Sequence, residues 1–197
     1  EDRAEFVRRY GANASKIVVA PNGADTTLYR PVDGPARAAL RQSLNLPPGP
    51  MAIFPAPHNQ TPIVEGLKWV RRVAALLPEV TFLVTGAVEG GPKVEGNLHF
   101  TGFVSKYESY LGSAGCFLCP IALGGGTKLK LIEAAAAGLP IAAFAESIRG
   151  TTFQADEHLL VVEHDAGALA AAVRRLLNEP GMAEQLGQAA HVHAARH

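Results

Sequence analysis

The chain has 197 residues, 48% of them hydrophobic, and a single domain of this length can bury a substantial core. Its 18 basic and 18 acidic side chains cancel, so no global field attracts nucleic acid or an anionic membrane, and we expect no nucleic-acid partner. No apolar run is long enough to span a bilayer, and no signal-peptide pattern opens the chain. Two cysteines argue against a disulfide framework and fit a cytoplasmic protein.

The first fifty residues predict short elements and connecting chain. Residues 1–10 have the pattern of a short charged helix, and the β-branched run at 16–20 predicts a strand that leads into a Pro-Asn-Gly turn at 21–23. Five prolines between residues 31 and 50 indicate a connector with a short helical piece at 37–42. Glu1 at the start, and a terminal helical stretch without a cap, suggest a piece of a longer protein.

From residue 51 onward, short apolar runs alternate with helical patterns. The predicted strands are 51–55, 80–85, 97–101, 116–120, 140–144 and 158–162. The predicted helices are 63–77, 106–111, 127–137, 166–177 and the stretch from 182. Continuous apolar strands that alternate with helices predict an α/β fold, a Rossmann-like three-layer domain whose parallel sheet is covered on both faces. Such sheets bind ligands at the carboxyl ends of the strands, where the strand order reverses.

The segment with the most chemical information joins a predicted strand to a predicted helix. Three consecutive glycines precede that helix, namely Gly124, Gly125 and Gly126. Such glycines let the backbone approach a ligand closely, and the free N–H groups of a helix that begins at Thr127 favour a phosphate. Lys128 and Lys130 add positive charge at the same helix end, where an ordinary helix favours acids. This pattern predicts an anion site.

Glu133 lies one to two turns into the same predicted helix, where its carboxylate can accept hydrogen bonds from neighbouring hydroxyls such as those of a ribose. Backbone amides for phosphates and a carboxylate for sugar hydroxyls together predict a site for a nucleotide diphosphate. The alternative is a glycine-rich turn before an ordinary amphipathic helix with solvated lysines. The motif is not a P-loop, because Lys128 follows Thr127 instead of a glycine. It is also not the Gly-x-Gly-x-x-Gly fingerprint that follows the first strand of dinucleotide-binding folds.

Three segments resemble the retaining glycosyltransferases of family 4 (group 1), which have the GT-B fold. Residues 124–141 are similar to that family's donor-site segment. Residues 18–25, Val-Val-Ala-Pro-Asn-Gly-Ala-Asp, match its approach to the C-terminal domain, usually written Pro-Asn-Gly-Val-Asp. Residues 100–104, which include Phe103 and Val104, resemble its segment beside the nucleotide base. The three matches follow the family's order and spacing over nearly the whole chain.

The resemblance implies a UDP- or GDP-linked sugar donor, transfer to an acceptor with retained anomeric configuration, and no metal ion or other cofactor. It also implies an acceptor-binding N-terminal domain outside this sequence. Residues 1–30 would then be the interdomain linker and leading strand, and residues 31–197 the nucleotide-sugar-binding domain. The chain would be the incomplete donor half of a hexosyl-type glycosyltransferase, in the cytoplasm or, in the full-length protein, peripheral to the inner face of the membrane.

The sequence departs from the family pattern in two places. The family usually carries two glutamates separated by seven residues; Glu133 fits the second, but Gly125 stands at the first. This loss favours a second hypothesis, in which the chain is a degenerate GT-B domain that acts as a binding or scaffold module. A third hypothesis, a nucleotide-sugar epimerase of similar fold, would need several acidic and histidine groups that we do not find.

The second departure concerns the basic pair that usually follows the family's first strand. That region reads Pro-Ala-Pro-His-Asn-Gln here, and the lysines of the glycine motif can substitute. His58 and Asn59 either reach the ligand from the end of their strand or only shape the turn. Cys116 and Cys119 have the Cys-x-x-Cys spacing, but side chains three apart on a strand face opposite ways, so we expect a buried strand rather than redox or metal chemistry.

Overall fold

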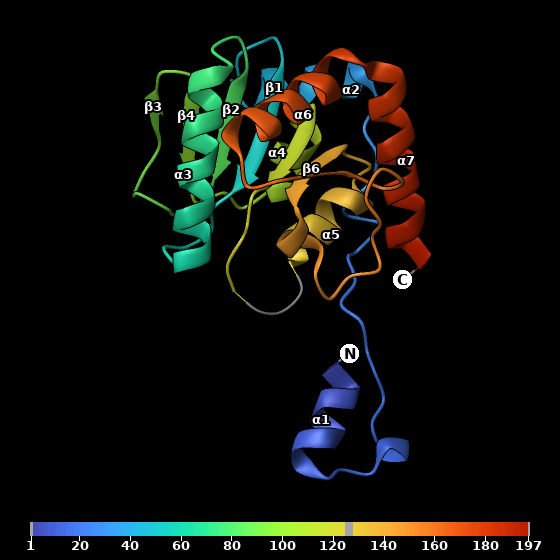
Figure 1. Ribbon diagram of the computed structural model, residues 1–197. Helices are drawn as coiled ribbons and strands as arrows, with labels where there is room; N and C mark the ends of the chain where they lie inside the picture. The colour runs from blue at the N-terminus through green and yellow to red at the C-terminus, as the bar shows by residue number, and fades with distance from the viewer. Residues whose placement is uncertain (1, 125–127, 197) are drawn as a thin grey trace.

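In the computed structural model, which describes residues 2–124 and 128–196, a seven-stranded sheet lies between two layers of helices (Figure 1). The strand order is β3-β4-β2-β1-β5-β6-β7. The strands are β1 (Met51–Pro55), β2 (Thr81–Thr85), β3 (Lys93–Glu95), β4 (Leu98–Gly102), β5 (Cys116–Cys119), β6 (Ile141–Phe144) and β7 (Leu160–Val162). Neighbouring strands are parallel, except that β3 runs antiparallel to β4. The predicted Rossmann-like α/β fold is confirmed.

The helices cover both faces of this sheet. They are α1 (Asp2–Tyr10), α2 (Gly34–Ser43), α3 (Thr61–Leu76), α4 (Tyr107–Ser113), α5 (Leu129–Ala136), α6 (Ala166–Asn178) and α7 (Pro180–Arg196), with 3-10 turns at Ala14–Lys16 and Ala145–Ile148. Helices α3 and α6 pack together on one face. Because parallel crossovers are right-handed as a rule, α4 and α5, whose connections run in the opposite direction along the sheet, lie on the other face. Helix α7 packs against α5 and α6. Among the described residues, no helix has the length and apolar character needed to cross a membrane.

Local side-chain hydrogen bonds explain several element boundaries. The Asp33 carboxylate accepts from the Ala36 amide at 2.8 Å at the start of α2. Asp165 accepts in the same way from Ala168 at the start of α6. The side-chain amide of Asn97 ties the end of α3 to the start of β2, because it donates to three main-chain carbonyls, those of Ala74, Leu77 and Val80. These contacts fix where the helices begin and how α3 connects to the sheet.

The strand predicted at residues 16–20 is wrong. Residues 17–20 have no regular secondary structure, and Val18 is 89% exposed and Val19 65% exposed. β-Branched residues favour an extended backbone, but a strand needs a neighbour to complete its hydrogen bonds. Within the described ranges, no strand pairs with this segment. Figure 1 shows α1 and the chain that follows it standing apart from the sheet.

Strand β3, at one edge of the sheet, was not predicted from the sequence. Lys93 forms ion pairs with Glu89 at 3.0 Å and with Glu95 at 2.7 Å. Arg71 of α3 pairs with the same two carboxylates, each at 2.6 Å. Both cations also lie over the ring of Phe100 on β4, at 4.9 and 5.3 Å from its centroid. Because this strand is three residues long and carries charges, it lacks the apolar pattern from which strands are predicted.

Candidate donor site at the switch point of the sheet

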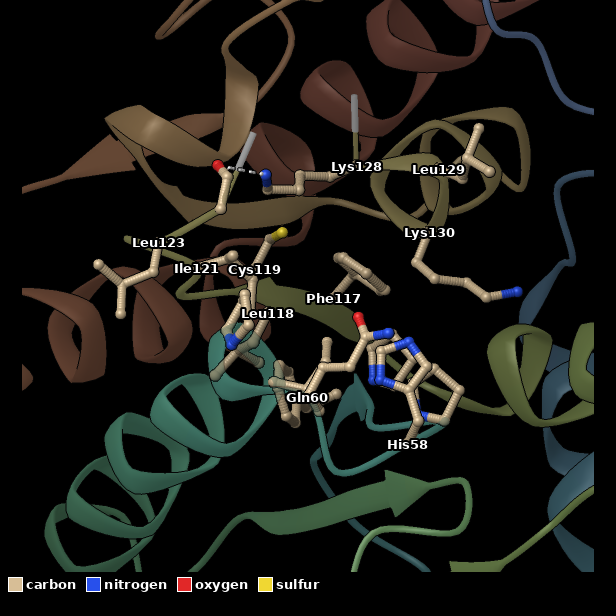
Figure 2. A pocket seen from close by; sticks show the side chains of 16 residues that line it. His58, Gln60, Phe117, Leu118, Cys119, Ile121, Leu123, Lys128, Leu129 and Lys130 are labelled. Carbon is tan, nitrogen blue, oxygen red and sulfur yellow. Dashed lines mark hydrogen bonds between the residues drawn. The ribbon is translucent and has the colours of Figure 1, made fainter. Parts of the chain in front are cut away.

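A cavity of about 350 Å³ opens beyond the carboxyl ends of β1 and β5, where the strand order reverses (Figure 2). This crevice is the usual ligand site of an open parallel sheet. Apolar side chains make up most of its lining, among them Phe54, Phe117, Leu118 and Ile121. The polar side chains that line it are His58, Gln60, Lys128 and Lys130. The cavity therefore combines an apolar interior with a rim of basic and amide groups.

One wall of the cavity is the loop that follows β1. Its backbone is tied to the end of β2, because the Ala56 amide donates to the Thr85 carbonyl at 2.6 Å and the Val88 amide donates to the Ala56 carbonyl at 3.2 Å. Gly86 permits this close approach: its φ is +122°, and an added Cβ would lie 2.6 Å from Pro57 Cα and closer still to the Ala56 carbonyl oxygen. Main-chain contacts thus hold this wall.

The opposite wall is the loop that follows β5, and a single buried hydroxyl ties it to the end of β6. Ser147 lies in the 3-10 turn after β6 and is fully buried. Its hydroxyl donates to the Cys119 carbonyl and lies 3.1 Å from the Ile121 carbonyl. The Ile121 amide donates to the Ser147 hydroxyl oxygen at 3.2 Å. This residue was missed by sequence reasoning, because no local motif links it to a loop 26 residues away.

The glycine motif leads from this second wall into α5. Gly124 has φ +88°, as a glycine permits, whereas Gly125, Gly126 and Thr127 lie outside the described residues. Lys128 occupies the N-cap position of α5, and its Nζ donates to the Gly124 carbonyl at 3.2 Å (Figure 2). The helix begins at Leu129, so Lys128 directly precedes its first turn. The ammonium group of Lys128 and the N-terminus of α5 therefore lie together at the cavity.

Glu133 lies one turn further along α5 and contacts the cavity lining through Lys130. The Lys130 Nζ is 2.8 Å from Glu133 Oε2 and 4.4 Å from the centroid of the Tyr107 ring. The Glu133 side chain is only 17% exposed. Burial raises the pKa of Tyr29 to about 12, and the adjacent negative charge of Glu133 adds to this shift. Burial also raises the pKa of Tyr107 well above its ordinary value. These side chains form a compact polar cluster beside the cavity.

Of the other predicted site residues that the structure describes, only His58 lines the cavity. Phe103, just after β4, is 83% exposed, and Val104 is half-buried; neither lines the cavity. Asn59 lines a separate hollow beside α3, whereas its neighbour His58 lines the cavity itself. Gln60, which sequence reasoning missed, lines the cavity as well, and its position in the same loop as His58 was the available signal. Within the described part of the chain, no group of His, Cys, Asp or Glu side chains is arranged to hold a metal ion.

The predicted Cys-x-x-Cys strand is confirmed as a buried element. Both thiols are free and buried in β5. Burial raises the pKa of Cys116 to about 12 and that of Cys119 to about 11. Both groups are therefore neutral thiols near neutral pH, which does not suit them to redox or metal chemistry.

Comparison with known proteins identifies the family. The model of the family described as glycosyl transferases group 1 matches residues 58–179, which contain His58, the loop after β5 and all of α5. The chain belongs to the group 1 glycosyltransferases. A curated relative, D-inositol 3-phosphate glycosyltransferase of Streptomyces avermitilis, is 30% identical over 220 residues that cover 98% of this chain and 46% of that protein. The chain thus spans about half the length of the curated relatives it matches.

Solved structures of glycosyltransferases share the fold. Alr3699/HepE of Anabaena, in complex with UDP and glucose, superposes with a TM-score of 0.79 at 15% identity, over 98% of this chain and 56% of that one. The C-terminal domain of a group 1 glycosyl transferase from Francisella tularensis superposes with a TM-score of 0.72 at 18% identity, over 88% of this chain and 97% of that one. The predicted C-terminal half of a GT-B glycosyltransferase is confirmed.

Proposed function

We propose that this chain binds the nucleotide diphosphate of a sugar donor and supplies the donor half of a retaining glycosyltransferase. The observation that carries the proposal is the arrangement of groups at the switch point. Lys128 and the start of α5 face the cavity, and the Glu133 carboxylate lies one turn beyond them. Phosphates at the first position and ribose hydroxyls at the second place a nucleoside diphosphate along the first two turns of α5.

UDP is the first nucleotide to test. The fold matches that of Alr3699/HepE, whose structures contain UDP and UDP-glucose. GDP is the second, because the resemblance to family 4 glycosyltransferases implies either a UDP- or a GDP-linked donor. In this proposal, the donor sugar extends from the diphosphate toward an acceptor-binding domain that precedes this chain in the full-length protein.

In the reaction, the bond between the anomeric carbon and the terminal phosphate oxygen breaks. A bond forms from the acceptor hydroxyl oxygen to the same face of that carbon, and the hydroxyl proton leaves with the nucleoside diphosphate. Lys128 and the α5 amides stabilise the negative charge that develops on the departing diphosphate, which supports a reaction without a metal ion.

Two free cysteines support a reducing compartment, and we place the activity in the cytoplasm.

A scaffold domain without nucleotide affinity is the second candidate. Gly125 stands where the family usually has its first glutamate, so the carboxylate that would bind the donor sugar is missing. The two candidates differ in one measurable property, because a working donor domain must bind a nucleoside diphosphate and a scaffold need not.

Calorimetric titration of the chain with UDP and GDP tests the proposal. We expect one nucleotide to bind, and we expect Lys128→Ala and Glu133→Ala each to weaken it roughly tenfold or more, the effect of losing a charge-assisted hydrogen bond. Lys68→Ala is the matched control, since this exposed lysine pairs with Glu65 on α3. If neither nucleotide binds to this chain or to the full-length protein, the result favours the hypothesis of a scaffold domain.

A further inference from the structure

Lys128 and Lys130 are two residues apart, but their ammonium groups point in opposite directions (Figure 2). The Lys128 Nζ turns back toward the Gly124 carbonyl, at 3.2 Å. The Lys130 Nζ extends away from the glycine motif and meets Glu133 Oε2 at 2.8 Å. The two lysines therefore lie at different ends of the proposed nucleotide site, although the sequence assigns both of them to the phosphates.

The Lys130 ammonium is held by two groups at once. Glu133 supplies an ion pair, and the ring face of Tyr107 lies 4.4 Å from Nζ. Movement of this ammonium toward a phosphate would break both contacts. It would also leave the Glu133 carboxylate, which is only 17% exposed, without its cation, and an unpaired, largely buried carboxylate is unfavourable.

The Glu133 carboxylate is in turn held from two directions. Lys130 donates to Oε2, and a carboxylate has about four acceptor positions on its two oxygens, so the group can also accept hydrogen bonds from a ligand. Tyr29, from the segment before α2, lies with its ring edge toward Tyr107 at 6.3 Å between centroids. Burial raises the pKa of Tyr29 to about 12, and the negative charge of Glu133 and a hydrogen bond to its side chain add to this shift. A carboxylate restrained in this way keeps one orientation toward a ribose.

We infer that Lys130 is a positioning residue for Glu133, with Tyr29 as a weaker second support, and that Lys130 does not bind the phosphates. The inference rests on the proposed function, in which Glu133 accepts hydrogen bonds from the ribose. Loss of Lys130 frees the carboxylate to take other rotamers, which weakens recognition of the ribose and leaves the phosphate end intact. Loss of Lys128 weakens binding of the phosphates and leaves recognition of the ribose intact.

The test compares UDP with 2′-deoxy-UDP by calorimetry on the whole 197-residue chain, with GDP and 2′-deoxy-GDP in their place if guanine binds better. The unchanged protein prefers the ribose form by roughly tenfold, the effect of one hydrogen bond to a charged group. Glu133→Gln and Lys130→Met bring this ratio close to one, and Lys130→Arg restores most of it. Lys128→Met, the matched control, weakens both nucleotides by a similar factor and leaves the ratio unchanged.

Tyr29→Phe is the second variant, because it removes one hydroxyl and keeps the ring packed. It lowers the ratio by about twofold to threefold, since the ion pair with Lys130 still restrains the carboxylate. Equal weakening of UDP and 2′-deoxy-UDP by Lys130→Met, with an unchanged ratio in Tyr29→Phe, overturns the inference and makes Lys130 a phosphate ligand. If the unchanged chain and the full-length protein bind neither nucleotide, the proposed function fails and the inference fails with it.

Discussion

The loops after β1 and β5 face each other across the cavity, but they depend on different contacts. Main-chain hydrogen bonds from Ala56 to the end of β2, made possible by Gly86, hold the β1 loop. The side-chain hydroxyl of Ser147 holds the β5 loop. A wall held by its backbone tolerates changes of its own side chains but not an added Cβ at the point of close approach. A wall held by a side chain depends on that one group.

The largest expected effect is on the backbone-held wall. Gly86→Val places a branched side chain against the Ala56 carbonyl at φ +122°, and we expect the free energy of unfolding to fall by about 3 kcal/mol or more. Urea unfolding followed by the fluorescence of the single tryptophan, Trp69, measures the change. Gly90→Val is the control: its φ is also positive, at +92°, but nothing lies within 4 Å of an added Cβ. Equal losses in both variants would show that backbone strain alone, and not close approach, matters at Gly86.

On the other wall, Ser147→Ala removes the hydroxyl that satisfies the Ile121 amide. A buried donor without a partner destabilises a protein by about 1–3 kcal/mol. We expect a loss in that range, together with weaker nucleotide binding, because the loop leads directly to Gly124. Ser43→Ala, which removes an exposed hydroxyl from the end of α2, should change stability by less than about 0.5 kcal/mol. A Ser147 variant as stable as this control would contradict the role assigned to the hydroxyl.

The two walls also differ in the charge that they offer to a diphosphate. In the proposed binding mode Lys128 pairs with the diphosphate, of which UMP has only one phosphate. Lys128→Met should therefore weaken UDP binding roughly tenfold, and UMP binding by a smaller factor. His58→Ala, on the β1 wall, should change both nucleotides by about twofold or less. Calorimetry with both ligands checks this difference. If His58→Ala weakened UDP binding more than Lys128→Met does, the phosphates would lie against the β1 wall instead of the β5 wall.

The last prediction concerns the reactivity of the Cys119 thiol, which lines the cavity on the β5 wall and which we expect to be nearly unreactive. Burial raises the pKa of its thiol to about 11, so the reactive thiolate is absent at neutral pH and forms only as the pH approaches that value. Alkylation by iodoacetamide, followed by mass spectrometry, should therefore be slow near neutral pH and fast after denaturation. Rapid labelling of the folded protein would show that the β5 wall opens to solvent.

The sequence predicts those parts of the molecule that depend on local pattern. Apolar runs predict β1 and β5, and the glycine motif predicts the start of α5 to within two residues. The strand predicted at 16–20 is wrong, because a strand also needs a neighbour, which a pattern along the chain does not specify. At the site, His58, Gly124, Lys128 and Lys130 line the cavity, and their contact with a nucleotide remains a prediction.

What the sequence does not predict depends on contacts between distant segments. Ser147 reaches a loop more than 20 residues away, and Tyr29 reaches a helix about 100 residues along the chain. The pairing of Lys130 with Glu133 is different, because residues three apart share a helix face and this contact was available from spacing alone.

Strand β3 has a consequence for how copies of this domain behave toward one another. The outer strand of an open sheet exposes unpaired main-chain groups, which invite a strand from a second molecule. Here that strand is three residues long, and its Lys93 and Glu95 are engaged in ion pairs with Glu89 and Arg71. An incoming chain would have to disrupt this network before it gained a main-chain hydrogen bond. The charged β3 edge therefore hinders intermolecular β-sheet growth at this side of the sheet, and so hinders aggregation by that route at high concentration.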